Sequence, residues 1–156
     1  IKKFDILLKP KDEPTNNFCI PSGEYREPKS FYKKANLVLK EGIDFKREVE
    51  IKKDGEKSEL PEKTILLTAI SKPKRLLEFL PKNIETIFFE DHHTFTKDEI
   101  DTILEKYREF GIVTTQKDFV KLEKFHLKNI YIMDLKIKLS EKLDFKELNT
   151  YLNINS

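Results

Sequence analysis

The sequence has one cysteine, one methionine, no tryptophan and four glycines among its 156 residues. The lone cysteine, Cys19, excludes an internal disulfide and a metal site built from several cysteines. No apolar run approaches the roughly 20 residues that cross a bilayer as a helix. The first residues also lack the continuous apolar core of a signal peptide. We therefore expect any membrane contact to be peripheral.

The sequence also lacks a strong excess of positive or of negative charge. Lys and Arg number 30 against 28 Asp and Glu, so the net charge is +2. A nucleic-acid-binding protein more commonly shows a basic excess or a clustered basic stripe. The chain has neither, because no basic run exceeds two residues. We expect a surface that carries solvated side chains of both charges, and we expect no nucleic-acid partner.

The glycines do not form a phosphate-binding loop. Such a loop needs an early glycine, a Gly-Lys pair and a helix that follows. The segment GEKS at residues 55–58 lacks all three features. The one methionine is Met133, so the chain as given does not begin at an initiator. We expect it to be part of a longer protein.

Short apolar runs indicate the fold class. An apolar content of 38% in 156 residues is enough for the core of an ordinary domain. Runs rich in branched and aromatic residues predict strands, several of them buried on both faces, at 4–8, 35–39, 64–70, 86–89, 112–115 and 130–133. Helical patterns lie at 74–80, 97–110, 119–125 and 145–152. Because strands and helices alternate, we predict an α/β fold with a mostly parallel sheet and covering helices.

Local signals predict where some elements begin and end. Thr96 and Glu99 form a capping box that predicts a helix start, and Gly111 is expected to be the C-terminal cap of that helix. Asp54-Gly55, between two extended pieces, predicts a small β-hairpin. We expect leading strands and a hairpin linker at residues 1–63, and a C-terminal α/β domain at residues 64–156.

The string FFEDHHTF at residues 88–95 places a carboxylate and two of the three histidines where an apolar strand ends. Groups at this end of a strand face the ligand crevice in open α/β sheets. His92 or His93 could orient a carboxylate, transfer a proton or bind a metal. Alternatively, Asp91 and one histidine satisfy backbone groups of a loop or a helix start. Phosphoesterases named for an Asp-His-His triplet also need further aspartates, and no Asp-x-Asp occurs here, so we expect no metal site.

Two further strings contain residues that could bind an anion. In GEYREP at residues 23–28, the Arg26 guanidinium could fork onto a phosphate, with Glu27 beside it. The alternative is a surface ion pair. In TTQKDFVKL at residues 114–122, hydroxyls, free amides and Lys117 could bind an anion at a helix start. The alternative is a simple helix cap, with Asp118 in the first turn.

Taken together and in this order, the three strings resemble the C-terminal half of the tetraacyldisaccharide 4'-kinase family, the lipid A 4'-kinases. The family patterns are Pro-x-Gly-x-x-Arg-Glu, Phe-x-Asp-His-His and Thr-Thr-x-Lys-Asp-x-Val-Lys-Leu. They match residues 21–28, 89–93 and 114–122. One departure is that the family usually has a glycine after the strand matched by residues 64–69, where this chain continues AISKP.

The resemblance implies a P-loop-kinase-like fold and an enzyme of lipid A biosynthesis. Such an enzyme transfers the γ-phosphoryl group of ATP to the 4'-hydroxyl of a tetraacylated disaccharide 1-phosphate. The resemblance also implies a partner, the N-terminal kinase half, which supplies the phosphate-binding loop, the Mg²⁺ carboxylates and the catalytic aspartate. The implied location is the cytoplasmic face of the bacterial inner membrane, in peripheral contact with lipid.

The resemblance also implies roles for particular residues. His92, with His93 as the less favoured candidate, would pair with the catalytic aspartate of the other half. Arg26 and Glu27 would lie near the cleft between the halves, where ATP binds. The resemblance assigns no chemical role to Lys117 and Asp118, although both match a family string. The competing interpretation is a non-catalytic α/β interaction domain that keeps the strings for folding reasons.

Overall fold

The computed structural model describes residues 3–22, 25 and 27–152. The chain forms two compact units, one of residues 1–47 with 137–156 and the other of residues 48–136. Strands β3 (Phe45–Lys53) and β8 (Ile130–Leu139) each contribute residues to both units. The domain boundary predicted after residue 63 stays a prediction, and the compact units divide the chain at other points.

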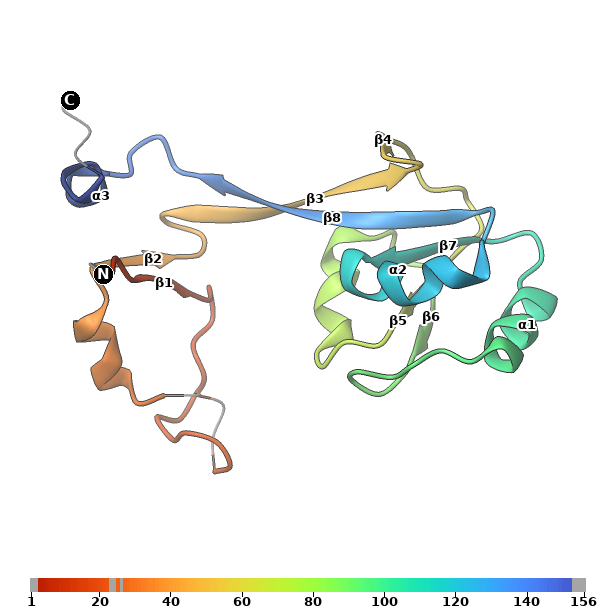
Figure 1. The fold of residues 1–156 in the computed structure, drawn as a ribbon, viewed down its shortest axis with the longest axis horizontal. Coiled ribbons are helices and arrows are strands. Elements are labelled where there is room, and N and C mark those ends of the chain that lie inside the picture. The colour runs from red at the N-terminus through yellow and green to blue at the C-terminus, as the bar shows by residue number, and fades with distance from the viewer. Residues whose placement is uncertain (1–2, 23–24, 26, 153–156) are drawn as a thin grey trace. The chain divides into compact units, whose positions relative to one another are not determined.

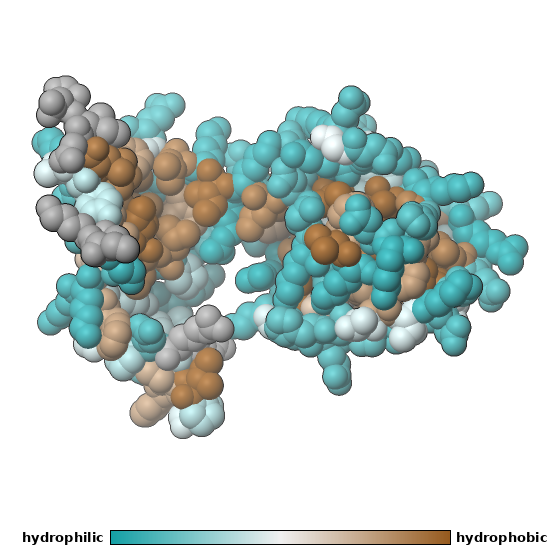
Figure 2. Space-filling model, in the orientation of Figure 1, coloured by the Kyte–Doolittle hydropathy of each residue, from teal (hydrophilic) through white to brown (hydrophobic). Residues whose placement is uncertain are grey.

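The first unit contains a parallel pair of strands. β1 (Ile6–Lys9) pairs with β2 (Leu37–Lys40), with Ile6 opposite Leu37 (Figure 1). The unit also holds the 3-10 helix η1 (Lys29–Lys34) and the helix α3 (Lys146–Tyr151). Both predicted strands are present, shifted by a few residues. Figure 2 shows apolar side chains on the surface of this unit, and among the exposed ones are Ile6, Leu8 and Val38.

The second unit is built on a sheet with the strand order β4-β3-β8-β7-β5-β6. Its remaining strands are β4 (Glu56–Lys57), β5 (Thr64–Thr68), β6 (Glu85–Phe88) and β7 (Gly111–Thr115). The pairs β6·β5, β5·β7 and β7·β8 are parallel, whereas β3 and β4 are antiparallel. The prediction of a mostly parallel sheet with a small hairpin is therefore confirmed.

β5 is buried along its whole length and separates two apolar clusters. Ile65 and Leu67 belong to one cluster and Leu66 to the other, because successive side chains of a strand point to opposite faces. The first cluster includes side chains of α1 (Lys97–Lys106) and α2 (Gln116–Leu122). The second includes side chains of the 3-10 helix η2 (Pro73–Phe79). Helical segments thus contribute to the cores on both faces of the sheet.

Two of the predicted local signals are present in the structure. Thr96 and Glu99 form the capping box, in which the Glu99 carboxylate accepts from the Thr96 amide at 2.8 Å. In the hairpin between β3 and β4, Asp54 has φ 52° and Gly55 has φ 85°. A type I′ turn needs positive φ at both central residues, which explains the Asp-Gly pair.

Gly111 is not the helix cap that we predicted. α1 ends earlier, with Tyr107 as its C-cap, and Gly111 is the first residue of β7. A Cβ atom at Gly111 would lie 2.8 Å from the Pro61 Cγ and 3.0 Å from a ring carbon of Tyr131. The glycine is required by this close approach of two distant segments, which no local pattern reveals.

Two of the predicted helices differ from the structure in type or length. The segment expected as a helix at 74–80 is the 3-10 helix η2, which begins at Pro73. Its three-residue period puts Leu76 and Phe79 on the same side, and both pack against the second cluster. α1 ends at Lys106 and not at residue 110. Among the described residues, no helix combines the length and the apolar character needed to span a membrane.

Candidate functional site

The candidate site is built on the turn that follows β6, where the sequence predicted it. The amide of His93 donates to the Glu90 carbonyl at 3.1 Å and closes the turn. The end of the neighbouring strand β5 holds the same segment. The Phe89 amide donates to the Thr68 carbonyl at 3.0 Å, and the His92 amide donates to the Ala69 carbonyl at 3.3 Å. We call residues 91–93 the Asp-His-His turn.

His92 projects from this turn in an unusual backbone conformation. Its φ is 66°, in the left-handed region that residues other than glycine rarely adopt. Its side chain is 78% exposed, and its Nε2 lies 3.7 Å from the Asp91 Oδ2. The imidazole is therefore accessible to a group from outside the described residues.

Asp91 links the turn to α2. Its Oδ1 accepts from the His92 amide at 3.1 Å and from the Lys117 ammonium at 3.3 Å. Desolvation acts to raise the pKa of the Asp91 carboxyl, but the Lys117 hydrogen bond and the nearby His92 outweigh it and lower the pKa. Asp91 is thus kept as a carboxylate, which accepts hydrogen bonds from both neighbours.

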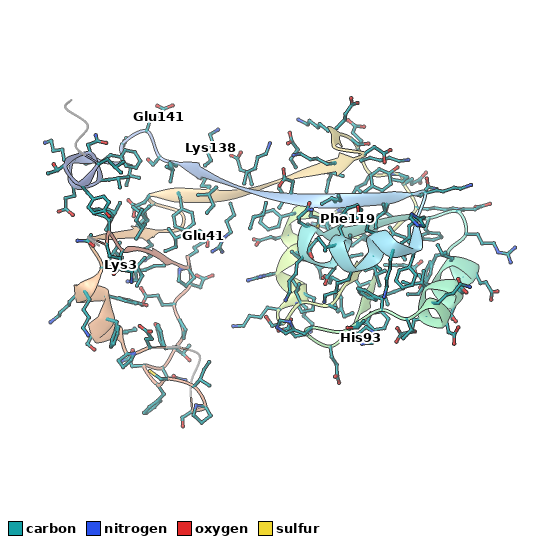
Figure 3. All side chains as sticks on the ribbon, in the orientation of Figure 1. Lys3, Glu41, His93, Phe119, Lys138 and Glu141 are labelled. Atoms are coloured by element: carbon teal, nitrogen blue, oxygen red, sulfur yellow. The ribbon has the colours of Figure 1, made fainter. Side chains whose placement is uncertain are left out.

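His93 lies in a different environment from His92. Its ring stacks on Phe89 with the centroids 4.5 Å apart and meets the edge of Phe95 at 5.5 Å. Its Nε2 lies 3.0 Å from the Glu99 Oε2 at the start of α1. Figure 3 shows His93 on the loop between β6 and α1. The sequence left open a histidine that satisfies backbone groups of a helix start, whereas His93 contacts the side chain of Glu99, a capping residue of that helix. The two adjacent histidines therefore have separate surroundings, one accessible and one packed.

Glu99 makes a pH-dependent contribution to stability. The Thr96 amide, the His93 ring and the Thr96 hydroxyl lower the pKa of its carboxyl from 4.5 to about 2. A folded-state pKa below the unfolded value gives stability above pH 4.5 that is lost as the pH falls toward 2. We expect Glu99→Gln to reduce the acid sensitivity of the thermal unfolding midpoint in this pH range. Glu105→Gln, an exposed change on the same helix, should leave it unchanged, and equal acid sensitivity in all three proteins would contradict the prediction.

The string at residues 114–122 forms the end of β7 and the helix α2. Thr115 is the N-cap, and its hydroxyl accepts from the Asp118 amide at 3.2 Å, as the capping alternative predicts. The Asp118 side chain is fully buried. Its Oδ2 accepts from the Thr68 hydroxyl at 2.6 Å, the Ala69 amide at 3.0 Å and the Thr115 hydroxyl at 3.0 Å. The sequence interpretation missed this role.

Lys121 completes the connection between the two strings. Its Nζ donates to the His93 carbonyl at 3.0 Å and lies 3.5 Å from the Asp118 Oδ1. The structure thus brings together residues 89–93 and 114–122, which the sequence could only place at two strand ends. The spacing of Asp118 and Lys121, on one side of a helix, is the one sequence signal of this arrangement.

The predicted phosphate contacts of Arg26 and Glu27 stay predictions. Arg26 lies outside the described residues. Glu27 is exposed in the first unit, where it lines a shallow pocket together with Lys3 and Phe31.

The described residues contain neither a Gly-rich phosphate-binding loop nor a cluster of three metal-ligating side chains. The sequence GEKS at 55–58 forms the hairpin turn and the short strand β4, with no helix start behind it. No three His, Cys, Asp or Glu side chains of the described residues come together in a way that could hold a metal ion.

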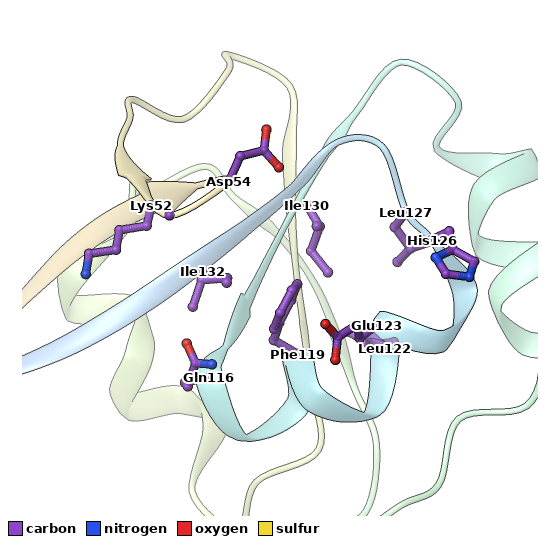
Figure 4. A pocket seen from close by; sticks show the side chains of 11 residues that line it. Lys52, Asp54, Gln116, Phe119, Leu122, Glu123, His126, Leu127, Ile130 and Ile132 are labelled. Carbon is purple, nitrogen blue, oxygen red and sulfur yellow. The ribbon is translucent and has the colours of Figure 1, made fainter.

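A separate hollow lies between α2 and the hairpin (Figure 4). Its lining is mainly apolar, with Phe119, Ile130 and Ile132 among its residues. The polar side chains around it include Lys52, Asp54 and Glu123. None of the residues of the Asp-His-His turn lines this hollow, so it is not part of the candidate site.

Comparison with known proteins relates this arrangement to one family. The family model described as tetraacyldisaccharide-1-P 4'-kinase matches residues 2–153. A tetraacyldisaccharide 4'-kinase of Aliarcobacter butzleri (strain RM4018) is 67% identical over 98% of this chain and 49% of that protein. One of Campylobacter jejuni subsp. jejuni serotype O:23/36 (strain 81-176) is 41% identical over 97% of this chain and 46% of that protein. The chain thus spans about half the length of these curated relatives.

A solved structure supports the fold. The LpxK of Aquifex aeolicus, described as an "apo" form in complex with ATP, matches 96% of this chain and 51% of its own with a TM-score of 0.58. At 21% sequence identity this likeness concerns the fold alone. The family model and the sequence relatives carry the assignment, and they agree with the resemblance of the three strings. The chain belongs to the tetraacyldisaccharide-1-P 4'-kinase family.

Proposed function

We propose that this chain is the C-terminal part of a lipid A 4'-kinase. The complete enzyme would transfer the γ-phosphoryl group of ATP to the 4'-hydroxyl of tetraacyldisaccharide 1-phosphate. Membership of the family is the observation that carries this proposal. ATP and Mg²⁺ would be bound mainly by the other half of the enzyme, because the described residues contain neither a Gly-rich phosphate loop nor a cluster of metal ligands.

In this proposal the chain contributes His92. The exposed imidazole on a left-handed turn is suited to reach a group supplied by the other half, which in this family would be the aspartate that activates the sugar hydroxyl. His92 would orient that aspartate and stabilise its charge. His93 is the less favoured candidate because its ring is engaged by Phe89, Phe95 and Glu99.

The proposal extends to the surroundings of the enzyme. We propose that it acts at the cytoplasmic face of the inner membrane and touches the lipid surface peripherally. Arg26 and Glu27 would lie at the cleft between the two halves, near ATP. Basic side chains on one edge would meet anionic lipid.

The direct test is phosphoryl transfer by the purified full-length protein. We expect it to phosphorylate tetraacyldisaccharide 1-phosphate at the 4'-position when ATP and Mg²⁺ are both present, detected by phosphorus NMR of the product. A reaction without ATP is the matched control. Absence of transfer by a folded full-length protein would favour the non-catalytic interaction domain.

A further inference from the structure

The proposed function assigns no role to Asp118, yet the environment of this side chain is exceptional. Among the described residues it is the one charged side chain that is buried. Helix capping does not explain this burial. Glu99 occupies the same third position of α1, where it serves as a capping residue while partly exposed to solvent. Burying a carboxylate is costly unless it is hydrogen-bonded, so its partners indicate its role.

The partners of Asp118 are the residues that support the Asp-His-His turn. Its Oδ2 accepts from the Thr68 hydroxyl and from the Ala69 amide. The carbonyls of these same two residues accept from the Phe89 and His92 amides. One carboxylate therefore sets the position of the end of β5, and that strand end sets the position of the turn.

Lys121 provides a second link from Asp118 to the turn. The Asp118 Oδ1 accepts no hydrogen bond, and the Lys121 Nζ lies 3.5 Å from it. The same Nζ donates to the His93 carbonyl at 3.0 Å. The carboxylate thus attracts the ammonium group to the place from which it binds the turn.

The turn needs support of this kind. The backbone of His92 has a left-handed conformation. This conformation costs free energy for a residue with a Cβ atom and persists only where the surroundings impose it. Its ring is exposed, so its direction depends on the backbone and not on packing. α2 contacts the turn at the Asp91 carboxylate through Lys117 and at the His93 carbonyl through Lys121.

We propose that Asp118, together with Lys121, is a positioning residue of the phosphoryl-transfer reaction. It fixes the backbone of the Asp-His-His turn so that His92 meets the catalytic aspartate in the correct geometry. This inference rests on the proposed function, since His92 requires that reaction. Asp118 acts through His92 and touches neither the substrate nor the reacting atoms.

The test is Asp118→Asn in the full-length enzyme. The asparagine keeps the shape and one acceptor oxygen for Thr68, Ala69 and Thr115, but it turns an NH₂ group toward the Lys121 ammonium. We expect kcat to fall about 10-fold, because a small displacement of a catalytic group has a large effect on rate. The KM for ATP should stay the same. Asp98→Asn, the same change at an exposed site in the first turn of α1, is the matched control and should leave kcat unchanged.

A double mutant separates positioning from a general loss of structure. In a His92→Ala background, Asp118→Asn should change kcat by no more than about twofold, because its effect passes through His92. The same fold loss in both backgrounds would overturn the inference. If His92→Ala alone leaves kcat unchanged, the proposed role of His92 fails first, and the single mutant shows this before Asp118 is altered.

Lys121→Met gives an independent test if Asp118→Asn folds poorly. Lys121 is partly exposed, so a methionine fills its place while removing the ammonium group. We expect a loss of kcat that again vanishes in the His92→Ala background. A thermal unfolding midpoint close to wild type would show that the variant is folded, and an unchanged kcat in that folded variant would overturn the inference.

Discussion

Replacing Phe95 by alanine is expected to lower the free energy of unfolding by about 3–5 kcal/mol, the range for removing a buried aromatic ring. Phe95 is 1% exposed and belongs to the cluster between β5 and the helices α1 and α2. Its ring also meets Phe89 edge-on at 5.3 Å and His93 at 5.5 Å. The change would therefore leave a cavity under the Asp-His-His turn as well as in the core.

Urea denaturation of the full-length protein measures this effect. Phe88→Ala is the control, because Phe88 is the neighbouring aromatic residue of β6 and is 38% exposed. We expect it to cost about 2–3 kcal/mol, because a residue that is 38% exposed buries roughly three-fifths of the apolar area that Phe95 buries. Equal losses for Phe95→Ala and Phe88→Ala would show that the assigned core is wrong.

His92→Ala in the full-length enzyme is expected to lower kcat about 100-fold, the scale on which positioned acid–base groups contribute. The imidazole would no longer orient the catalytic aspartate. The KM for ATP should change little, because the described residues offer no cradle for the phosphates. Steady-state kinetics with varied ATP and with varied disaccharide separates the two parameters.

His126→Ala is the matched control for this variant. His126 is also exposed, and its φ of 51° is left-handed like that of His92. Both alanine variants therefore carry a similar backbone cost, but His126 lies outside the Asp-His-His turn. A loss of kcat in His93→Ala and not in His92→Ala would move the catalytic role to His93. Full activity in both His92→Ala and His93→Ala would leave these two histidines with structural roles.

The features that could be predicted from the sequence are those decided by neighbouring residues. The helix start at Thr96 needs only Glu99 three residues later, and the hairpin needs only Asp54-Gly55. The strand predicted at 64–70 is present at Thr64–Thr68, because a short apolar run bounded by polar residues is typical of a parallel sheet. The strand predicted at 86–89, which is β6 in the structure, places the Asp-His-His turn at a strand end.

The features that could not be predicted depend on residues far apart in the chain. Gly111 is required by Pro61 and Tyr131, and Asp118 bonds to Thr68 and Ala69, 50 and 49 residues away. A local pattern contains no information about such contacts. From the sequence alone, Gly111 therefore resembles the C-terminal cap of a helix, and Asp118 resembles an acidic residue that favours the helix dipole. The different surroundings of His92 and His93 arise in the same way.

The complete burial of β5 has a consequence for strand register. A strand with one solvent-exposed face resists a one-residue shift of its pairing register, because the shift would turn its apolar side chains toward water. β5 lacks this protection, since Ile65, Leu66 and Leu67 are all buried. The threonine at its end supplies the missing information, because the Thr68 hydroxyl donates to the Asp118 carboxylate of α2 at 2.6 Å. A slipped strand would lose this long-range bond, so the carboxylate that supports the turn also favours the native alignment of the central sheet.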